Sequence, residues 1–338
     1  GTGMDKRIWQ AAGIGTLGLA AVPLLVRSSP WPGAWLVRRL FARSDAQAHA
    51  RLARHVPPGI VARRDLVYGA GPDERLDLYR PAAAEGPLPV LVWVHGGGWV
   101  GGSRQVVGNW LQVLAGAGYA TVAVGYSTAR RDARYPTPLR QVDRALDWLE
   151  TYADRLGIDP ARVLLGGSSA GAQISAQVAL MGSSPGYARR LGIAPSAAAR
   201  KLRGVVLLSG AFDIRGVGEN WFVNSLLWAY TGQRHFRRDP WLQLMAITPH
   251  LGARFPPAFV SSGTHDPLAP QAHALVQRMA QLGLDCDSLF FAPDSPPSPH
   301  EFQFDLDSAA GKQCLRHLTA FLARHSAQGP TLAQAASA

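Results

Sequence analysis

Short apolar runs alternate with longer periodic segments through the middle and C-terminal parts of this 338-residue chain. A strand that is covered on both faces is apolar at every position, so each run predicts a buried parallel strand. The runs are Val90–Val94, Ala120–Val124, Val163–Leu165, Val205–Leu208, Ala258–Val260 and Ser288–Phe291. The periodic segments predict helices, and they are Gln105–Ala117, Leu139–Leu156, Ala170–Met181, Gln271–Leu282 and Asp305–His325. This alternation predicts an α/β protein with a doubly wound, mostly parallel sheet.

Two regions depart from this rhythm. The segments Arg64–Tyr68 and Arg75–Tyr79 alternate between apolar and polar positions around a turn rich in glycine, which predicts an antiparallel hairpin. The segment Asp213–Leu251 lies between two predicted strands and is too long for a simple crossover. Because it is rich in aromatic residues, we expect it to form an inserted cap.

The N-terminal part of the chain leaves several interpretations open. The run Ile8–Val26 holds 19 residues without a charge, which is nearly the length that spans a hydrocarbon core. It is compatible with a membrane anchor, with a helix buried against the protein's own cap, or with a cleaved signal peptide. An anchored or exported protein is therefore favoured over a cytoplasmic one. The stretch Ala34–Val56 predicts a pair of amphipathic helices over an apolar surface.

These patterns predict one α/β domain with an N-terminal helical segment before it and a short tail after it. Its parts are an expression scar at residues 1–3, hydrophobic and amphipathic helices at 4–60 that serve as an anchor or as part of the cap, an α/β domain at 61–325 with the cap insertion at about 213–251, and a tail at 326–338.

Composition narrows the classes of function. The formal net charge is +11, and all but three of the 34 basic residues are arginine. The arginines are scattered, which argues against a nucleic-acid binder and leaves attraction to an anionic membrane surface as an alternative. The two cysteines, Cys286 and Cys314, exclude a disulfide-stapled fold and a multi-cysteine zinc site. We expect no metal or organic cofactor, and the oligomeric state stays open.

A candidate nucleophile lies between a predicted strand and a predicted helix. Residues Gly167–Gly171 read Gly-Ser-Ser-Ala-Gly and match G-x-S-x-G with Ser169 at the centre. Small residues on both sides allow the sharp turn that holds such a serine at the carboxyl end of a sheet. Ser168 has no glycine two places later, so we assign the nucleophile to Ser169.

A second motif supplies candidate groups that would stabilise negative charge. Residues His95–Trp99 read His-Gly-Gly-Gly-Trp and follow the strand Val90–Val94, as in an oxyanion-hole loop. Glycines let successive backbone N–H groups point inward together. With the N–H of Ala170, they are expected to bind the oxyanion of a tetrahedral intermediate.

A serine nucleophile needs a base and an acid that orients the base. In the chain order Ser, Asp, His that accompanies this nucleophile turn, His300 follows a late strand and Asp266 follows the strand Ala258–Val260. We therefore expect His300 to take the proton of Ser169 and Asp266 to hold the imidazole in place. His265 and His273 are alternatives for the base, and Asp294 is an alternative for the acid.

Together these motifs resemble the hormone-sensitive-lipase-like branch of the α/β-hydrolase superfamily. The resemblance runs from about Leu66 to His325, and its motifs are His95–Trp99, Gly167–Gly171, Asp266–Leu268 and His300. It implies an α/β-hydrolase fold with about eight strands, a helical cap from the N-terminal helices and the insertion, and hydrolysis of carboxylic esters. It also implies that Gly97, Gly98 and Ala170 donate to the oxyanion.

The chain departs from the pattern of that branch at several positions. Ser168 stands where the branch has an acidic residue, and Glu301 stands where it has a glycine. The segment after Tyr126 lacks the usual Ala-Pro-Glu, Pro270 replaces a frequent second aspartate, and the loop Pro293–Pro299 is rich in proline. No member of the triad is lost, so these departures bear on the range of substrates.

The sequence thus predicts a serine carboxylesterase that acts through an acyl-enzyme on a small-molecule ester. The aromatic cap favours short to medium acyl chains. An amidase of the arylformamidase kind shares the His-Gly-Gly…Trp loop and the serine chemistry, and it is the first alternative. A ligand-binding receptor on a catalytically silent hydrolase scaffold is the second.

Overall fold

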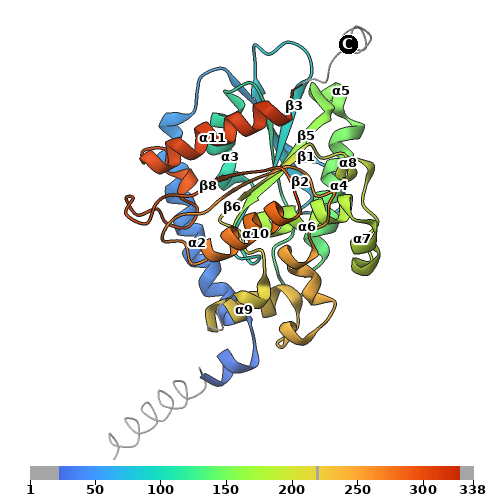
Figure 1. Cartoon of the computed structure of the whole chain (residues 1–338), viewed down its shortest axis with the longest axis vertical. Coiled ribbons are helices and arrows are strands. Elements are labelled where there is room, and N and C mark those ends of the chain that lie inside the picture. Colours follow the sequence, from blue (N-terminus) through green and yellow to red (C-terminus); the bar gives the residue numbers. More distant parts are fainter. Residues whose placement is uncertain (1–22, 218–220, 328–338) are drawn as a thin grey trace, which may run out of the picture.

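One continuous sheet of eight strands forms the centre of the molecule (Figure 1). The computed structural model describes residues 23–217 and 221–327. The strand order is β1-β2-β4-β3-β5-β6-β7-β8, in which β2 pairs antiparallel with β1 and β4 and the other pairs are parallel. The strands are β1 (Ile60–Val67), β2 (Arg75–Pro81), β3 (Leu88–Val94), β4 (Ala120–Val124), β5 (Ile158–Ser168), β6 (Gly204–Leu208), β7 (Ala258–Ser261) and β8 (Cys286–Leu289). The prediction of a mostly parallel α/β sheet with an antiparallel hairpin is confirmed.

Helices cover both faces of this sheet (Figure 1). They are α2 (Trp31–Leu52), α3 (Gly108–Ala115), α4 (Thr137–Thr151), α5 (Ala153–Leu156), α6 (Ala170–Ser183), α7 (Pro185–Leu191), α8 (Ala197–Arg200), α9 (Trp221–Thr231), α10 (Ala269–Gln281) and α11 (Ala309–His325). Side chains alternate between the faces of a strand, so Val90, Val92 and Val94 join the apolar cluster beneath α4, α6 and α10. Leu91 and Trp93 join the cluster beneath α3 and α11. Both faces are buried, which explains the unbroken apolar runs.

The helices differ from the predictions in several places, and the helix predicted over Leu139–Leu156 is divided into α4 and α5. The prediction of two helices over Ala34–Val56 is wrong, because α2 is one continuous helix from Trp31 to Leu52. Its alanine, leucine and arginine residues are good helix formers, and no glycine or proline interrupts them between Gly33 and Pro57. Helices α7 and α8 were not predicted, because both are short and lie in a segment without clear helical periodicity.

The apolar run Ile8–Val26 lies mostly outside the described residues. Residues 23–28 are helical, and Leu24 and Leu25 are exposed. Within 23–217 and 221–327, no helix combines the length and the hydropathy needed to cross a bilayer.

The inserted segment Asp213–Leu251 contains α9, which lies against α2 at the lower end of the molecule in Figure 1. The two helices cross closely at Gly33, where an added methyl group would come within 2.8 Å of the Cβ atom of Ser225. Gly33 and Ser225 are 192 positions apart in sequence, so two distant segments pack together here. This contact is the observation that supports a cap of mixed origin.

Candidate active site

Ser169 occupies a sharp turn between the end of β5 and the start of α6. Its backbone has φ 55° and ψ −123°, a conformation that L-residues rarely adopt. The turn is possible because the residues at 167 and 171 are glycines, and a side chain at either position would clash with neighbouring backbone atoms. A methyl group on Gly171 would come within 2.0 Å of the carbonyl oxygen of Val94, and one on Gly167 within 2.4 Å of the backbone of Gly171. The structure thus places Ser169, which is partly exposed, in the strand-to-helix turn that the sequence predicts.

The structure brings the three predicted triad residues into hydrogen-bond contact. The Oγ atom of Ser169 lies 3.0 Å from Nε2 of His300, and Nδ1 of His300 lies 2.8 Å from Oδ2 of Asp266. In this arrangement the serine hydroxyl donates to Nε2 while Nδ1–H donates to the carboxylate. That tautomer is the one a histidine needs in order to accept a proton from serine.

Asp266 is buried and its oxygens are held from several sides. The backbone N–H of Leu268 donates to Oδ1 over 2.8 Å, and the hydroxyl of Ser262 donates to Oδ2 over 3.1 Å. Burial by itself raises the pKa of this carboxyl, but the hydrogen bond and charge of His300 and the N–H of Leu268 outweigh it and lower the pKa below its usual value. Asp266 therefore stays ionised beside His300.

The pKa of His300 is shifted in the opposite direction from that of Asp266. Burial lowers the pKa of the imidazole, whereas the hydrogen bond to Asp266 and the charges of Glu301 and Asp266 raise it, and the net direction is upward. A base with a raised pKa holds the proton of Ser169 more readily. Two carboxylates, one on each side of the ring, are the physical cause.

The glycine loop after β3 lies directly beside the serine. A methyl group on Gly96 would come within 3.1 Å of Cβ of Ser169. Gly97 and Gly98 have φ values of 126° and 59°, which only glycine adopts freely. The backbone N–H groups of Gly97, Gly98 and Ala170 donate no hydrogen bond to any residue that the structure describes. Groups of this kind can bind an oxyanion.

His95 fixes the start of this loop. The imidazole is buried, stacks on Tyr126 at 4.3 Å between ring centroids, and places Nδ1 2.6 Å from the carbonyl oxygen of Gly96. Burial lowers its pKa to about 4, so it is neutral at physiological pH. Tyr126 in turn donates its hydroxyl to the carbonyl oxygen of His95 over 2.8 Å.

The far end of the loop is tied to α6 by residues that the sequence did not reveal. The indole N–H of Trp99 donates to Oε1 of Gln173 over 3.0 Å, and the amide of Gln173 donates to Gln177 and to the carbonyl oxygen of Met245. Two glutamines four residues apart on an otherwise apolar helix were the available signal, since buried polar side chains must find partners.

The alternatives for the base and the acid lie elsewhere. His265 is exposed and has its Nδ1 atom 3.1 Å from Oγ1 of Thr264. His273 stacks on Phe290 at 4.0 Å between ring centroids. Asp294 is exposed. None of them is hydrogen-bonded to Ser169 or His300 among the described residues.

Two of the departures from the family pattern meet beside the triad. Oγ of Ser168 donates to Oε2 of Glu301 over 2.6 Å, and Oε1 of Glu301 lies 3.7 Å from Nε2 of His300. The sequence marked both positions but could not connect residues 133 apart.

The space above the loop is crowded by the two helices of the N-terminal and inserted segments. A methyl group on Gly98 would come within 3.0 Å of Cδ1 of Leu226 on α9 and within 3.1 Å of Cε2 of Phe41 on α2. Tyr230 of α9 also stacks on Trp99, with ring centroids 5.6 Å apart. Apolar side chains from two distant segments therefore cover the candidate oxyanion site.

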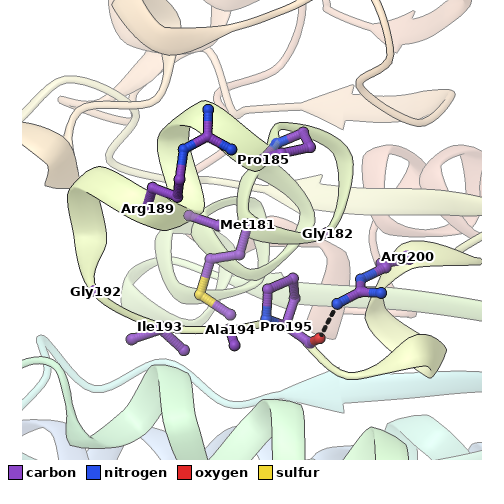
Figure 2. A pocket seen from close by; sticks show the side chains of 10 residues that line it. Met181, Gly182, Pro185, Arg189, Gly192, Ile193, Ala194, Pro195 and Arg200 are labelled. Atoms are coloured by element: carbon purple, nitrogen blue, oxygen red, sulfur yellow. Dashed lines mark hydrogen bonds between the residues drawn. The ribbon is translucent and has the colours of Figure 1, made fainter.

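A cavity of about 430 Å³ lies away from this site, at the C-terminal end of α6 (Figure 2). Apolar side chains line it together with Arg189 and Arg200, and Arg200 donates to the carbonyl oxygen of Pro195 over 3.0 Å. It contains none of the predicted site residues. The described parts of the chain also hold no group of three or more His, Cys, Asp or Glu side chains arranged to bind a metal ion.

Comparison with known proteins places this geometry in a family. The chain is 31% identical to the esterase LipC of Mycobacterium tuberculosis over 65% of this chain and 55% of the relative. It is 34% identical to the carboxylesterase NlhH of the same species over 39% of this chain and 43% of the relative. The chain thus spans about half the length of the curated relatives it matches.

Solved structures share the fold. Esterase B from Lactobacillus rhamnosis, in a structure with a tributyrin phosphonate, superposes with a TM-score of 0.74 at 22% identity, covering 87% of this chain and 96% of that one. A bacterial heroin esterase gives a TM-score of 0.69 at 23% identity, covering 85% and 91%. The family model BD-FAE matches residues 76–279, which is more than half of the chain. The chain therefore belongs to the BD-FAE family, within the hormone-sensitive-lipase-like carboxylesterases of the α/β-hydrolase superfamily.

Proposed function

We propose that this protein is a serine carboxylesterase that hydrolyses small-molecule carboxylic esters. The observation that carries the proposal is the hydrogen-bonded series Ser169, His300 and Asp266 beside the glycine loop. The names of the relatives, which include an esterase and a carboxylesterase, support the same class of reaction.

The residues divide the reaction between them. Oγ of Ser169 attacks the ester carbonyl carbon while its proton passes to Nε2 of His300, and the N–H groups of Gly97, Gly98 and Ala170 bind the negative oxygen. The carbon–oxygen bond to the alcohol then breaks, and His300 returns the proton to the leaving alcohol. Water attacks the acyl-enzyme by the same route, which releases the acid and restores Ser169.

We assign the enzyme to short or medium acyl chains. Phe41, Leu226 and the Trp99–Tyr230 stack crowd the space next to Gly98, where the ester carbonyl would lie. Bulky apolar walls at this distance leave room for a limited acyl group and provide an apolar surface for it.

The proposal is tested with p-nitrophenyl esters of increasing acyl length and the variant Ser169→Ala. We expect hydrolysis by the wild type and a loss of kcat by about 10³-fold or more in the variant, because removal of a nucleophile leaves only binding and oxyanion stabilisation. Ser183→Ala, on the same helix α6 with its hydroxyl bonded to the carbonyl oxygen of Ala179, is the matched control and keeps full activity.

An intact fold is checked by circular dichroism. Equal activity of Ser169→Ala and wild type contradicts the assignment of the nucleophile. The esterase and the amidase alternative share the serine chemistry, so the relative rates on the two substrates separate them. Faster hydrolysis of an N-formyl aryl amide than of the matching aryl ester favours the amidase.

A further inference from the structure

A second carboxylate lies beside His300, on the side that faces the serine. We propose that Glu301 is a positioning residue that stabilises the protonated form of His300 during proton transfer, with Ser168 holding its carboxylate in place. The proposal rests on the proposed serine mechanism and adds a residue that the triad does not include.

The two oxygens of the Glu301 carboxylate make different contacts. Oε2 accepts the hydroxyl of Ser168 over 2.6 Å, and Oε1 lies 3.7 Å from Nε2 of His300. The backbone N–H of Glu301 donates to Oγ of Ser209 over 3.1 Å, and the side chain is only 22% exposed. One oxygen is therefore anchored next to the nucleophile while the other remains near the imidazole.

The backbone at this position points to a function for the side chain. Glu301 has φ 57°, in the left-handed region that favours glycine. Of the four other non-glycine residues with positive φ in the described chain, Trp99, Ser169 and Ser209 lie at the site, and Asp65 lies in β1. Strained residues persist where the surrounding structure requires them, and they cluster at functional sites. A glutamate that occupies such a conformation keeps a charge there at a cost in stability.

The groups that face Glu301 come from several elements. Asp45 of α2, His95 of the glycine loop and Phe304 line the same cavity of about 20 Å³, which has room for one water. Burial and the charge of Glu301 raise the pKa of Asp45 to about 7. The charge of Glu301 also contributes to the raised pKa of the buried Tyr126, and His95 is neutral.

The resulting arrangement places the imidazole between two acids. When Ser169 loses its proton to Nε2, the ring becomes positively charged, with Asp266 at Nδ1 and Glu301 close to Nε2. An opposite charge within about 4–6 Å favours the charged form of an ionisable group. The charge of Glu301 is one of the causes that raise the pKa of His300. Glu301 thus lowers the free energy of the state in which Ser169 is activated.

The experiment measures kcat/KM against pH for the wild type, Glu301→Gln and Glu301→Gly. Glutamine removes the charge and can still accept the hydroxyl of Ser168, and glycine removes the side chain and suits φ 57°. We expect the midpoint of the acid limb to fall by about one pH unit in both variants, with kcat reduced and KM changed less than about twofold. Glu150→Gln removes a carboxylate on α4 whose partner is Lys201, and it keeps the wild-type midpoint.

The outcomes separate this inference from the proposed function. Active Glu301 variants with the wild-type midpoint, or an equal shift in Glu150→Gln, overturn the role of Glu301 and leave the esterase intact. If the wild type hydrolyses no ester, the proposed function fails. In that case, or if the variants are inactive, the NMR titration of His300 in the folded proteins decides: a lower pKa without Glu301 supports the inference, and an unchanged pKa overturns it.

Discussion

Neighbouring charges set the chemistry of His300 at the scale of single residues. The ring is partly buried and has Asp266 at 2.8 Å on one side and Glu301 at 3.7 Å on the other. Burial favours the neutral ring and the carboxylates favour the charged one, and the carboxylates prevail. The pKa of His300 therefore lies above the usual value of about 6.5.

This direction predicts the acid limb of the pH profile. His300 must be neutral to accept the proton of Ser169, so activity is lost as pH falls through the pKa of His300 in the folded enzyme. Because that pKa is raised, we expect kcat/KM to fall with a midpoint above about 6.5. A profile in which kcat/KM on a p-nitrophenyl ester stays constant down to about pH 5 contradicts the assignment of His300 as base.

The close crossing of α6 over the sheet matters at the scale of elements. Helix α6 begins directly after Ser169, and Gly171 in its first turn lies against the carbonyl oxygen of Val94 at the end of β3. The glycine therefore lets the helix approach the strand closely enough to hold both the serine and the glycine loop. This contact joins the two motifs of the sequence, together with the approach of Gly96 to Ser169 and the hydrogen bond from Trp99 to Gln173.

The variant Gly171→Ala tests this contact. Its Cβ would lie 2.0 Å from the oxygen of Val94, so α6 has to move, and we expect a loss of about 3 kcal/mol in the free energy of unfolding together with loss of activity. Gly186→Ala, within α7, meets nothing closer than 3.9 Å, and it is expected to be neutral or to stabilise by up to about 1 kcal/mol. Urea unfolding of both variants gives the comparison, and equal stabilities would falsify the packing argument.

The cover over the site is a property of the whole molecule. Phe41 comes from α2 near the N-terminus and Leu226 from α9 in the inserted segment, and both approach Gly98. The two segments also pack on each other, because α9 approaches α2 closely at Gly33. Under the proposed function, we therefore expect parts of the chain that lie far apart in sequence to limit the size of the substrate.

Shortening the cover is expected to lengthen the preferred acyl chain. Phe41→Ala removes an aromatic ring whose Cε2 atom would lie 3.1 Å from a methyl group on Gly98. We therefore expect the ratio of kcat/KM for an octanoyl ester to kcat/KM for a butyryl ester to rise by about tenfold. Trp35→Ala, on the same helix but 57% exposed, is the matched control. An unchanged ratio in Phe41→Ala, or an equal rise in Trp35→Ala, removes α2 from the acyl pocket.

Local sequence patterns were sufficient to predict the strands, the turns and the candidate site residues of this protein. Buried parallel strands appear as unbroken apolar runs, and the turns around Ser169 and after β3 need glycines at fixed places. Chain order then singled out His300, which the structure places against Ser169, and Asp266, which it places against His300. Each of these signals lies within one element or at its end.

Tertiary structure decided what depends on contacts between distant segments. The hydrogen bond between Ser168 and Glu301 across 133 positions and the approach of both Phe41 and Leu226 to Gly98 follow from how the fold brings distant segments together. Gln173 likewise gained its role from the indole of Trp99, 74 positions away. Periodicity and turn residues carry local information, whereas partners of this kind exist only after the chain has folded.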